Sequence, residues 1–179
     1  MGAFVVIGLI EPAAVDFDVT PGAAGALMTA YAVAYAVLSP LLVSLTGRMG
    51  RRRVMALGLG LFALAALTSA IAPTLTVLAA ARVLAAAGAG MFTPVAAAVA
   101  AALYPAERRA RVLAAVFFGL TLAQVLGVPV GAWVAYSFGW RWAFWVVVAL
   151  ALPALVVIWL CVPRGLSFQP VTLVDLGRT

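Results

Sequence analysis

Two charged residues, Arg82 and Glu11, lie inside long apolar stretches of the sequence. A lone arginine near the centre of a membrane helix costs about 2.5–3.5 kcal/mol on insertion scales, so we expect Arg82 to face the interior of a helix bundle. The alternative is that its long side chain reaches the outer headgroups. Glu11 precedes a proline that frees backbone groups to line a cavity, and a glutamate there can bind and release protons. The alternative for Glu11 is a position at the outer mouth, because Asp16 and Asp18 follow closely.

Patterns typical of catalysis or metal binding are missing from the sequence. It contains no histidine and a single cysteine, Cys161, so the commonest metal ligand is absent and neither a disulfide framework nor a cysteine-based zinc site can form. We find no nucleophile beside a base and no glycine-rich loop that could hold a phosphate. The sequence therefore predicts no enzyme, no cofactor and no metal.

Composition points to a membrane protein. Of the 179 residues, 67% are hydrophobic and 9% are charged. In an average soluble domain, roughly a quarter of the residues are charged. The mean hydropathy is +1.22. A water-soluble fold of this length cannot bury so much apolar surface, because a large part of any folded surface faces water. The sequence therefore indicates an integral membrane protein.

Apolar runs of bilayer-crossing length make up most of the chain, since a crossing needs about 20 helical residues. A partial run covers residues 2–15, and full-length runs cover 23–45, 54–72, 75–103, 112–136 and 142–162. The partial run is too short to cross at about 1.5 Å per residue, so we expect the first span to begin upstream. The sequence predicts an all-α bundle of six transmembrane helices over residues 1–163. The first of these helices is expected to be truncated. Residues 164–179 are expected to form a cytoplasmic tail or the start of a central loop.

Arginines are concentrated in two of the short loops. The loop between the second and third runs carries Arg48, Arg51, Arg52 and Arg53, and the loop between the fourth and fifth carries Arg108, Arg109 and Arg111. Basic residues in short loops remain cytoplasmic, so both clusters and both termini are predicted inside. The same charges would attract anionic lipid headgroups. The net charge of +6 raises nucleic-acid binding as an alternative, but no soluble module carries the arginines.

The first arginine cluster resembles a motif of the major facilitator superfamily. TGRMGRRRVMALG is similar to the pattern G-x-L-A-D-R-x-G-R-R/K between the second and third spans of that family. The matching positions are Leu45, Arg48, Gly50, Arg51 and Arg52, while Val43 and Gly47 replace the first glycine and the aspartate. RVLAAAGAGMFTPVAAAVAAALYPAERRAR resembles the fourth span and the loop after it. GLTLAQVLGVPVGAWVA resembles the fifth-span antiporter motif, and FGWRWAFW the entry to the sixth span.

The resemblance is greatest to the drug:proton antiporter group, in its arabinose-efflux or chloramphenicol-resistance branch. It implies the N-terminal half of a twelve-span transporter in the bacterial inner membrane, with a C-terminal half as its partner. The implied function is proton-coupled efflux of small amphipathic compounds, drugs or sugars, by alternating access. Arg82 would then help to couple substrate and proton. Arg48, Gly50, Arg51 and Arg52 would form the cytoplasmic gating motif. In the family, the aspartate of this motif pairs across the cytoplasmic face and stabilises the outward-facing state, and Gly47 stands in its place here.

Substrate contact is predicted at four polar residues within the spans: Tyr31, Tyr35, Thr121 and Gln124. Such groups can orient an otherwise apolar ligand. Tyr31 and Tyr35 are four residues apart and so lie on one helix face. Each of the four alone is as consistent with helix packing, and the identity of the substrate does not follow from the sequence.

Small residues recur every four positions in the fifth run, at Gly119, Ala123, Gly127 and Gly131. This spacing lets another helix approach closely, and Pro129 adds a bend. We expect this stripe to serve as a packing face, a hinge, or both. The spacing repeats at Arg82, Ala86, Gly90 and Pro94, so the two faces are predicted to meet or to line one cavity.

A second class of function stays open at this stage. The chain has the length of one transporter half, which offers a single wall of the usual cavity. The alternative is therefore a truncated six-span membrane protein without transport activity, acting as a structural or assembly partner.

Overall fold

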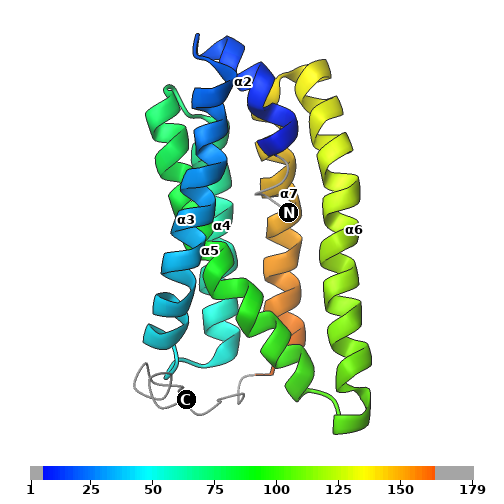
Figure 1. The fold of residues 1–179 in the computed structure, drawn as a ribbon. Coiled ribbons are helices and arrows are strands. Elements are labelled where there is room, and N and C mark those ends of the chain that lie inside the picture. The colour runs from blue at the N-terminus through cyan, green and yellow to red at the C-terminus, as the bar shows by residue number, and fades with distance from the viewer. Residues whose placement is uncertain (1–5, 164–179) are drawn as a thin grey trace.

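The computed structural model describes residues 6–163. The predicted tail at 164–179 and residues 2–5 of the partial first run lie outside this part of the chain. Within it, all elements are helices: η1 (Val6–Leu9), α2 (Ile10–Asp16), α3 (Pro21–Leu45), α4 (Arg51–Ala70), α5 (Leu75–Ala102), α6 (Ala106–Phe138) and α7 (Trp140–Cys161). Five of them, α3 to α7, are long and apolar enough to cross a membrane. The predicted all-α bundle is confirmed (Figure 1).

The arginine clusters were predicted to lie in loops, and for most of the residues this is wrong. Helix α6 begins at Ala106 and α4 begins at Arg51. The arginines that follow these starts therefore lie on the first turns of helices, and only Arg48 lies in a turn. The reason is that a long arginine side chain can carry its charge to the headgroups while its backbone remains helical. A helix need not end where its apolar run ends.

Threonines and backbone geometry fix where the helices begin. Thr20 accepts a hydrogen bond from the backbone N–H of Ala23, 3.2 Å, at the start of α3. Thr74 accepts one from the N–H of Val77, 3.3 Å, at the start of α5. Such caps satisfy backbone donors that the first helical turn leaves without partners. Between α6 and α7 stands Gly139 with φ of 98°, a conformation that favours glycine and allows an abrupt turn.

The helices lie side by side along the length of the bundle (Figure 1). Helix α5 packs extensively on α4 and α3, and α4 packs on α7. Helix α6 stands at one side, next to α7, and its contacts with α5 and α7 are fewer. No residue in the apolar window of α6 is buried, and 6% of the residues in the window of α3 are. These two helices therefore have the smallest buried shares among the five spanning helices.

Glycines bring α4 and α5 into their closest contact. A Cβ atom added at Gly88 would lie 2.6 Å from the carbonyl oxygen of Gly58 and 2.6 Å from the backbone nitrogen of Phe62. On the other side of α5, the Ser39 hydroxyl of α3 donates a 3.0 Å hydrogen bond to the carbonyl of Gly90. Close backbone approach of this kind is how small residues join membrane helices.

The first segment, η1 and α2, occupies one end of the bundle. It is too short to cross a bilayer, as predicted for the partial run. Leu9 and Ala13 pack in a core with Ala135 of α6 and Trp140 of α7. This segment therefore closes the end of the bundle at which α6 turns into α7 (Figure 1).

Candidate functional site

Arg82 lies inside the bundle, about two turns into α5. Its side chain is 2% exposed. Its Nη2 atom donates a hydrogen bond of 2.7 Å to the hydroxyl oxygen of Ser69 on α4. That hydroxyl donates in turn to the carbonyl of Ala65, 2.7 Å away. The short chain of hydrogen bonds anchors a full positive charge to the neighbouring helix.

Helices α7 and α3 complete the surroundings of Arg82. The guanidinium carbon lies 4.8 Å from the ring centroid of Phe144 on α7, within the range of a cation–π interaction. Tyr31 of α3 is close enough for an electrostatic interaction with Arg82. Tyr31 stacks on Tyr35, with ring centroids 6.2 Å apart and an angle of 19° between the rings. Three helices thus place groups around one buried cation on a fourth.

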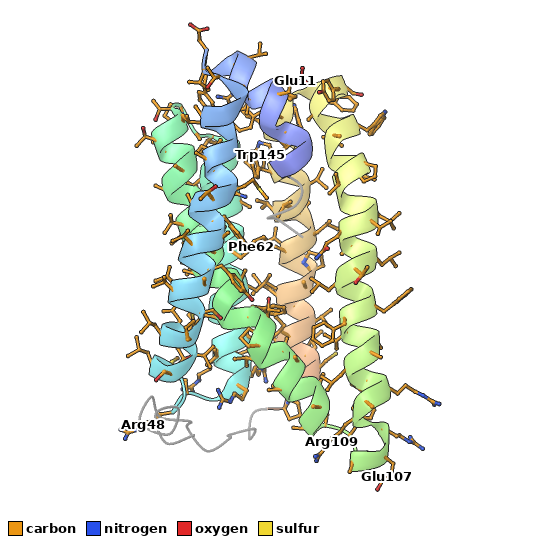
Figure 2. The ribbon with its side chains drawn as sticks, in the orientation of Figure 1. Glu11, Arg48, Phe62, Glu107, Arg109 and Trp145 are labelled. Atoms are coloured by element: carbon orange, nitrogen blue, oxygen red, sulfur yellow. The ribbon has the colours of Figure 1, made fainter. Side chains whose placement is uncertain are left out.

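Glu11 lies at the far end of the bundle from the arginine clusters. In Figure 2 it is labelled at one end, while Arg48, Glu107 and Arg109 are labelled at the other. Its side chain is exposed, and its Oε2 atom accepts a 2.8 Å hydrogen bond from the Tyr136 hydroxyl of α6. The position matches the alternative held open for Glu11, a place at the mouth.

The two remaining predicted substrate-contact residues, Thr121 and Gln124, lie on α6. Thr121 is exposed, and its hydroxyl donates a 3.0 Å hydrogen bond to the carbonyl of Phe117 in the same helix. Gln124 is half-buried. A hollow of about 290 Å³ between α3 and α5 is lined by Ala23, Ala26, Leu27, Ala30, Leu75, Thr76 and Ala79. Of the four predicted residues, Tyr31 interacts with Arg82, and Tyr35 stacks on Tyr31.

The predicted packing stripe of the fifth run is only partly in contact. Gly131 is buried and Gly127 is half-buried, whereas Gly119 and Pro129 are exposed. Within residues 6–163, no atom outside its own helix lies within 4 Å of a Cβ placed at Gly119. On α5, the stripe residue Gly90 meets Ser39 of α3. The contacts made by Gly58, Gly88 and Ser39 were not predicted from the sequence.

The residues of the gating motif lie at the basic end. Gly50 precedes the first residue of α4, Arg51 is 8% exposed, and Arg48 is exposed. Figure 2 shows Arg48 extending away from the bundle. Arg52 lies over the Trp159 ring of α7, 4.4 Å from its centroid. Gly47, where the family pattern has an aspartate, is buried.

An ion-pair cluster at the opposite end was missed by the sequence reading. The Nη1 atom of Arg141 on α7 donates a hydrogen bond of 2.5 Å to the Asp16 carboxylate. Its Nη2 atom donates one of 3.0 Å to the carbonyl of Ala72. Trp140 also donates to Asp16, at 3.2 Å, and its ring lies 5.4 Å from that of Phe17. We call these five residues the Arg141 cluster. It ties α2, the α4–α5 turn and the start of α7 together.

The Arg141 cluster also sets the charge state of its acid. The hydrogen bond from Arg141 holds the pKa of Asp16 below its ordinary value of 3.8; partial burial opposes this, and the Trp140 hydrogen bond adds to it. Asp16 is therefore ionised at neutral pH. The signal in the sequence was that the loops after the first and fifth runs belong to the same side and carry opposite charges.

Long apolar helices gathered around a buried arginine define a multi-pass membrane protein. The model of the Major Facilitator Superfamily matches residues 1–171. The chain belongs to this superfamily, as its motifs indicated, and corresponds to the N-terminal half of such a protein.

Relatives from three bacteria illustrate the match. The chain is 40% identical over 163 residues to a chloramphenicol resistance protein of Streptomyces lividans, covering 90% of the chain and 41% of that protein. It is 32% identical over 172 residues to the uncharacterized MFS-type transporter YbcL of Bacillus subtilis, covering 96% and 44%. It is 35% identical over 159 residues to the inner membrane transport protein YdhP of Escherichia coli, covering 89% and 41%. The chain thus spans less than half the length of these relatives.

Solved structures support the same fold. A peptide transporter POT in complex with sulfate matches with a TM-score of 0.82 at 18% identity, over 98% of this chain and 38% of that one. A bacterial homologue of the human lysosomal transporter Spinster, inward-facing and unoccupied, matches with a TM-score of 0.77 at 21% identity, over 93% and 41%. At these identities the likeness concerns the fold alone.

Proposed function

We propose that this chain forms the N-terminal half of a transporter that exports small amphipathic compounds in exchange for protons. Membership of the superfamily supports transport, and the chloramphenicol resistance protein among the relatives supports efflux of a drug-like substrate. The basic end with Arg48 and Arg109 faces the cytoplasm in this proposal, because basic loops remain inside. The end of α7 then lies on the cytoplasmic side, and η1 and α2 lie at the outer end of the bundle.

The observation that carries the proposal is the burial of Arg82. A guanidinium that is 2% exposed and held by Ser69 keeps its charge at a fixed place inside the protein. A fixed buried cation favours the ionised form of an acid or an anionic substrate group that comes near it. Tyr31 and Tyr35 offer an aromatic surface on the adjacent helix for the apolar part of the substrate.

Alternating access requires a second half against which this one can rock. We assign that contact to the exposed faces of α3 and α6, which have the fewest buried residues of the spanning helices. Gly119, Gly127, Pro129 and Gly131 lie along α6. In this proposal their small side chains and the bend serve the contact with the second half rather than the packing within this one.

Glu11 is the proposed proton carrier. Its exposed carboxylate at the mouth can exchange protons with water, and its hydrogen bond to Tyr136 joins α2 to α6. Protonation of Glu11 removes the negative charge that strengthens this hydrogen bond. A change at Glu11 is thereby linked to the helix that we assign to the interface between the halves.

The test is transport by the full-length protein in proteoliposomes, with and without an imposed pH gradient. Chloramphenicol serves as the first substrate because a relative confers resistance to it. We expect gradient-driven efflux in the wild type and a loss of most of it in Arg82→Ala, with Arg109→Ala at the exposed basic end as the matched control. Efflux that ignores the gradient would remove the proton coupling, and equal efflux in both variants would remove the role of Arg82.

The same assay distinguishes this proposal from the alternative, a six-span protein without transport activity. The 179-residue chain is reconstituted alone and together with the second half. Transport only in the combined sample supports the proposal. Absence of transport in both samples, with the halves shown to associate, supports a structural or assembly role.

A further inference from the structure

A hollow of about 500 Å³ opens at the basic end, between the start of α4 and the last turns of α7. The described residues that line it are Gly50, Arg52, Arg53 and Trp159. Two of these four are cations, and none is an acid. The hollow is separate from Arg82, which lies two turns from the opposite end of α5.

Arg52 is positioned toward this hollow by its aromatic neighbour. Its guanidinium carbon lies 4.4 Å from the Trp159 ring centroid, and such stacking holds the planar group in one orientation. Within residues 6–163 its buried Nε atom has no hydrogen-bond partner. The ion pair recorded in that part of the chain, between Arg141 and Asp16, is at the other end of the bundle. Arg52 as a whole is half-buried and lines the hollow, so the outer part of its guanidinium can donate to an anion with several acceptor oxygens.

An apolar helix face continues from the hollow. Leu152, Val156 and Trp159 are spaced for one face of α7, and their side chains are 55%, 56% and 50% exposed. A phosphate group fits the guanidinium donors, and an acyl chain fits the exposed aliphatic face. A tryptophan at the junction is typical of the membrane interface. A free phosphate would use the cations only, whereas a phospholipid uses both parts.

We propose that this hollow binds an anionic phospholipid, with its phosphate on Arg52 and Arg53 and an acyl chain along α7. The proposal does not depend on the transport activity. It predicts one specifically retained lipid at this place, in addition to the general attraction of the basic surface for anionic headgroups.

The test counts lipids that stay bound to the purified chain. The protein is reconstituted with phosphatidylglycerol or phosphatidylcholine, extracted in mild detergent, and examined by native mass spectrometry. The variant Arg52→Gln/Arg53→Gln is compared with Arg108→Gln/Arg109→Gln, which removes the same charge from exposed residues at the same end (Figure 2). Two cations near the surface correspond to roughly tenfold or more in lipid affinity. We expect the retention of phosphatidylglycerol to fall by about this factor in the first variant. In the second variant it is expected to change by no more than about twofold.

Further arms distinguish the sources of the binding. Arg52→Lys keeps the charge but loses the planar fork and the stacking, so we expect several-fold weaker retention even if the double variant fails to fold. Excess inorganic phosphate is expected to leave phosphatidylglycerol bound. Equal losses in the two double variants would show a diffuse surface effect and overturn the proposal. Displacement by inorganic phosphate, or equal retention of phosphatidylcholine, would overturn it as well.

Discussion

The Nη2 atom of Arg82 lies 2.7 Å from the Ser69 hydroxyl, so a charged side chain of α5 is bound to α4 where both residues are almost fully buried. A hydrogen bond to a charged group contributes more than a neutral one. The contact therefore serves two purposes, since it joins two helices and fixes the place of the charge that we assign to transport.

Removing the Ser69 hydroxyl tests the strength of this contact. We expect Ser69→Ala to lower the free energy of unfolding in detergent by about 1–2 kcal/mol, because it withdraws an acceptor from a buried charged donor. The measurement is the unfolding equilibrium followed by circular dichroism. Thr68→Ala is the matched control, since the Thr68 hydroxyl donates to the carbonyl of Leu64 in its own helix. Equal losses in the two variants would contradict the assignment.

The contact between Gly58 and Gly88 predicts a steric effect. A methyl group at Gly88 would lie 2.6 Å from backbone atoms of α4 that cannot rotate away, so α4 and α5 must separate. We expect Gly88→Ala to destabilise the bundle by about 1–3 kcal/mol. Gly60→Ala is the control, because nothing lies within 4 Å of a Cβ at that position, and alanine there favours the helix. A Gly88 variant as stable as the Gly60 variant would refute the close contact.

The sequence predicted the five spanning helices that the structure describes, and their order, because each crossing needs one continuous apolar run. It also placed Arg82 in the bundle interior, since the cost of a charge in lipid leaves few alternatives. The partners Ser69 and Phe144 could not be predicted in the same way. Which residues face each other depends on how neighbouring helices are rotated, and the runs are apolar on every side.

The helix starts and the packing glycines show the same limit. Arg108 and Arg109 lie on a helix although they follow a loop signal, because long side chains decouple charge from backbone position. The four-residue spacing on α6 is a clear signal for packing, yet Gly119 meets no other helix in the described part of the chain. The actual close contact uses Gly58 and Gly88, one from each helix, and a single pair leaves no periodic signal.

The Arg141 cluster predicts a loss of stability in acid. The pKa of Asp16 is held below its ordinary value of 3.8 in the folded protein, mainly by Arg141. A lowered pKa means that the stabilisation is fully present above the unfolded value and is lost as pH falls through the folded one. We expect the melting temperature of the wild type to fall below about pH 4.

Substitution at Asp16 isolates this effect. Asp16→Asn removes the ion pair at every pH, so its melting temperature is lower than that of the wild type at pH 7 and approaches it in acid. Asp18→Asn is the control, because Asp18 is exposed and its φ of 52° is also tolerated by asparagine. If Asp16→Asn matched the wild type at pH 7, the ion pair would contribute nothing to stability.

Glu11 provides the last prediction, which concerns coupling rather than stability. Glu11→Gln keeps the size of the side chain and its ability to accept from Tyr136, but it cannot release a proton. We expect the full-length variant to lose the stimulation of efflux by a pH gradient while it still exchanges substrate down a substrate gradient. Both rates are measured in the same proteoliposomes. Glu107→Gln, an exposed glutamate at the opposite end of the bundle (Figure 2), serves as the control and should retain both. Full gradient-driven efflux in Glu11→Gln would assign the proton to another group, because a side chain without an ionisable proton cannot carry one across the membrane.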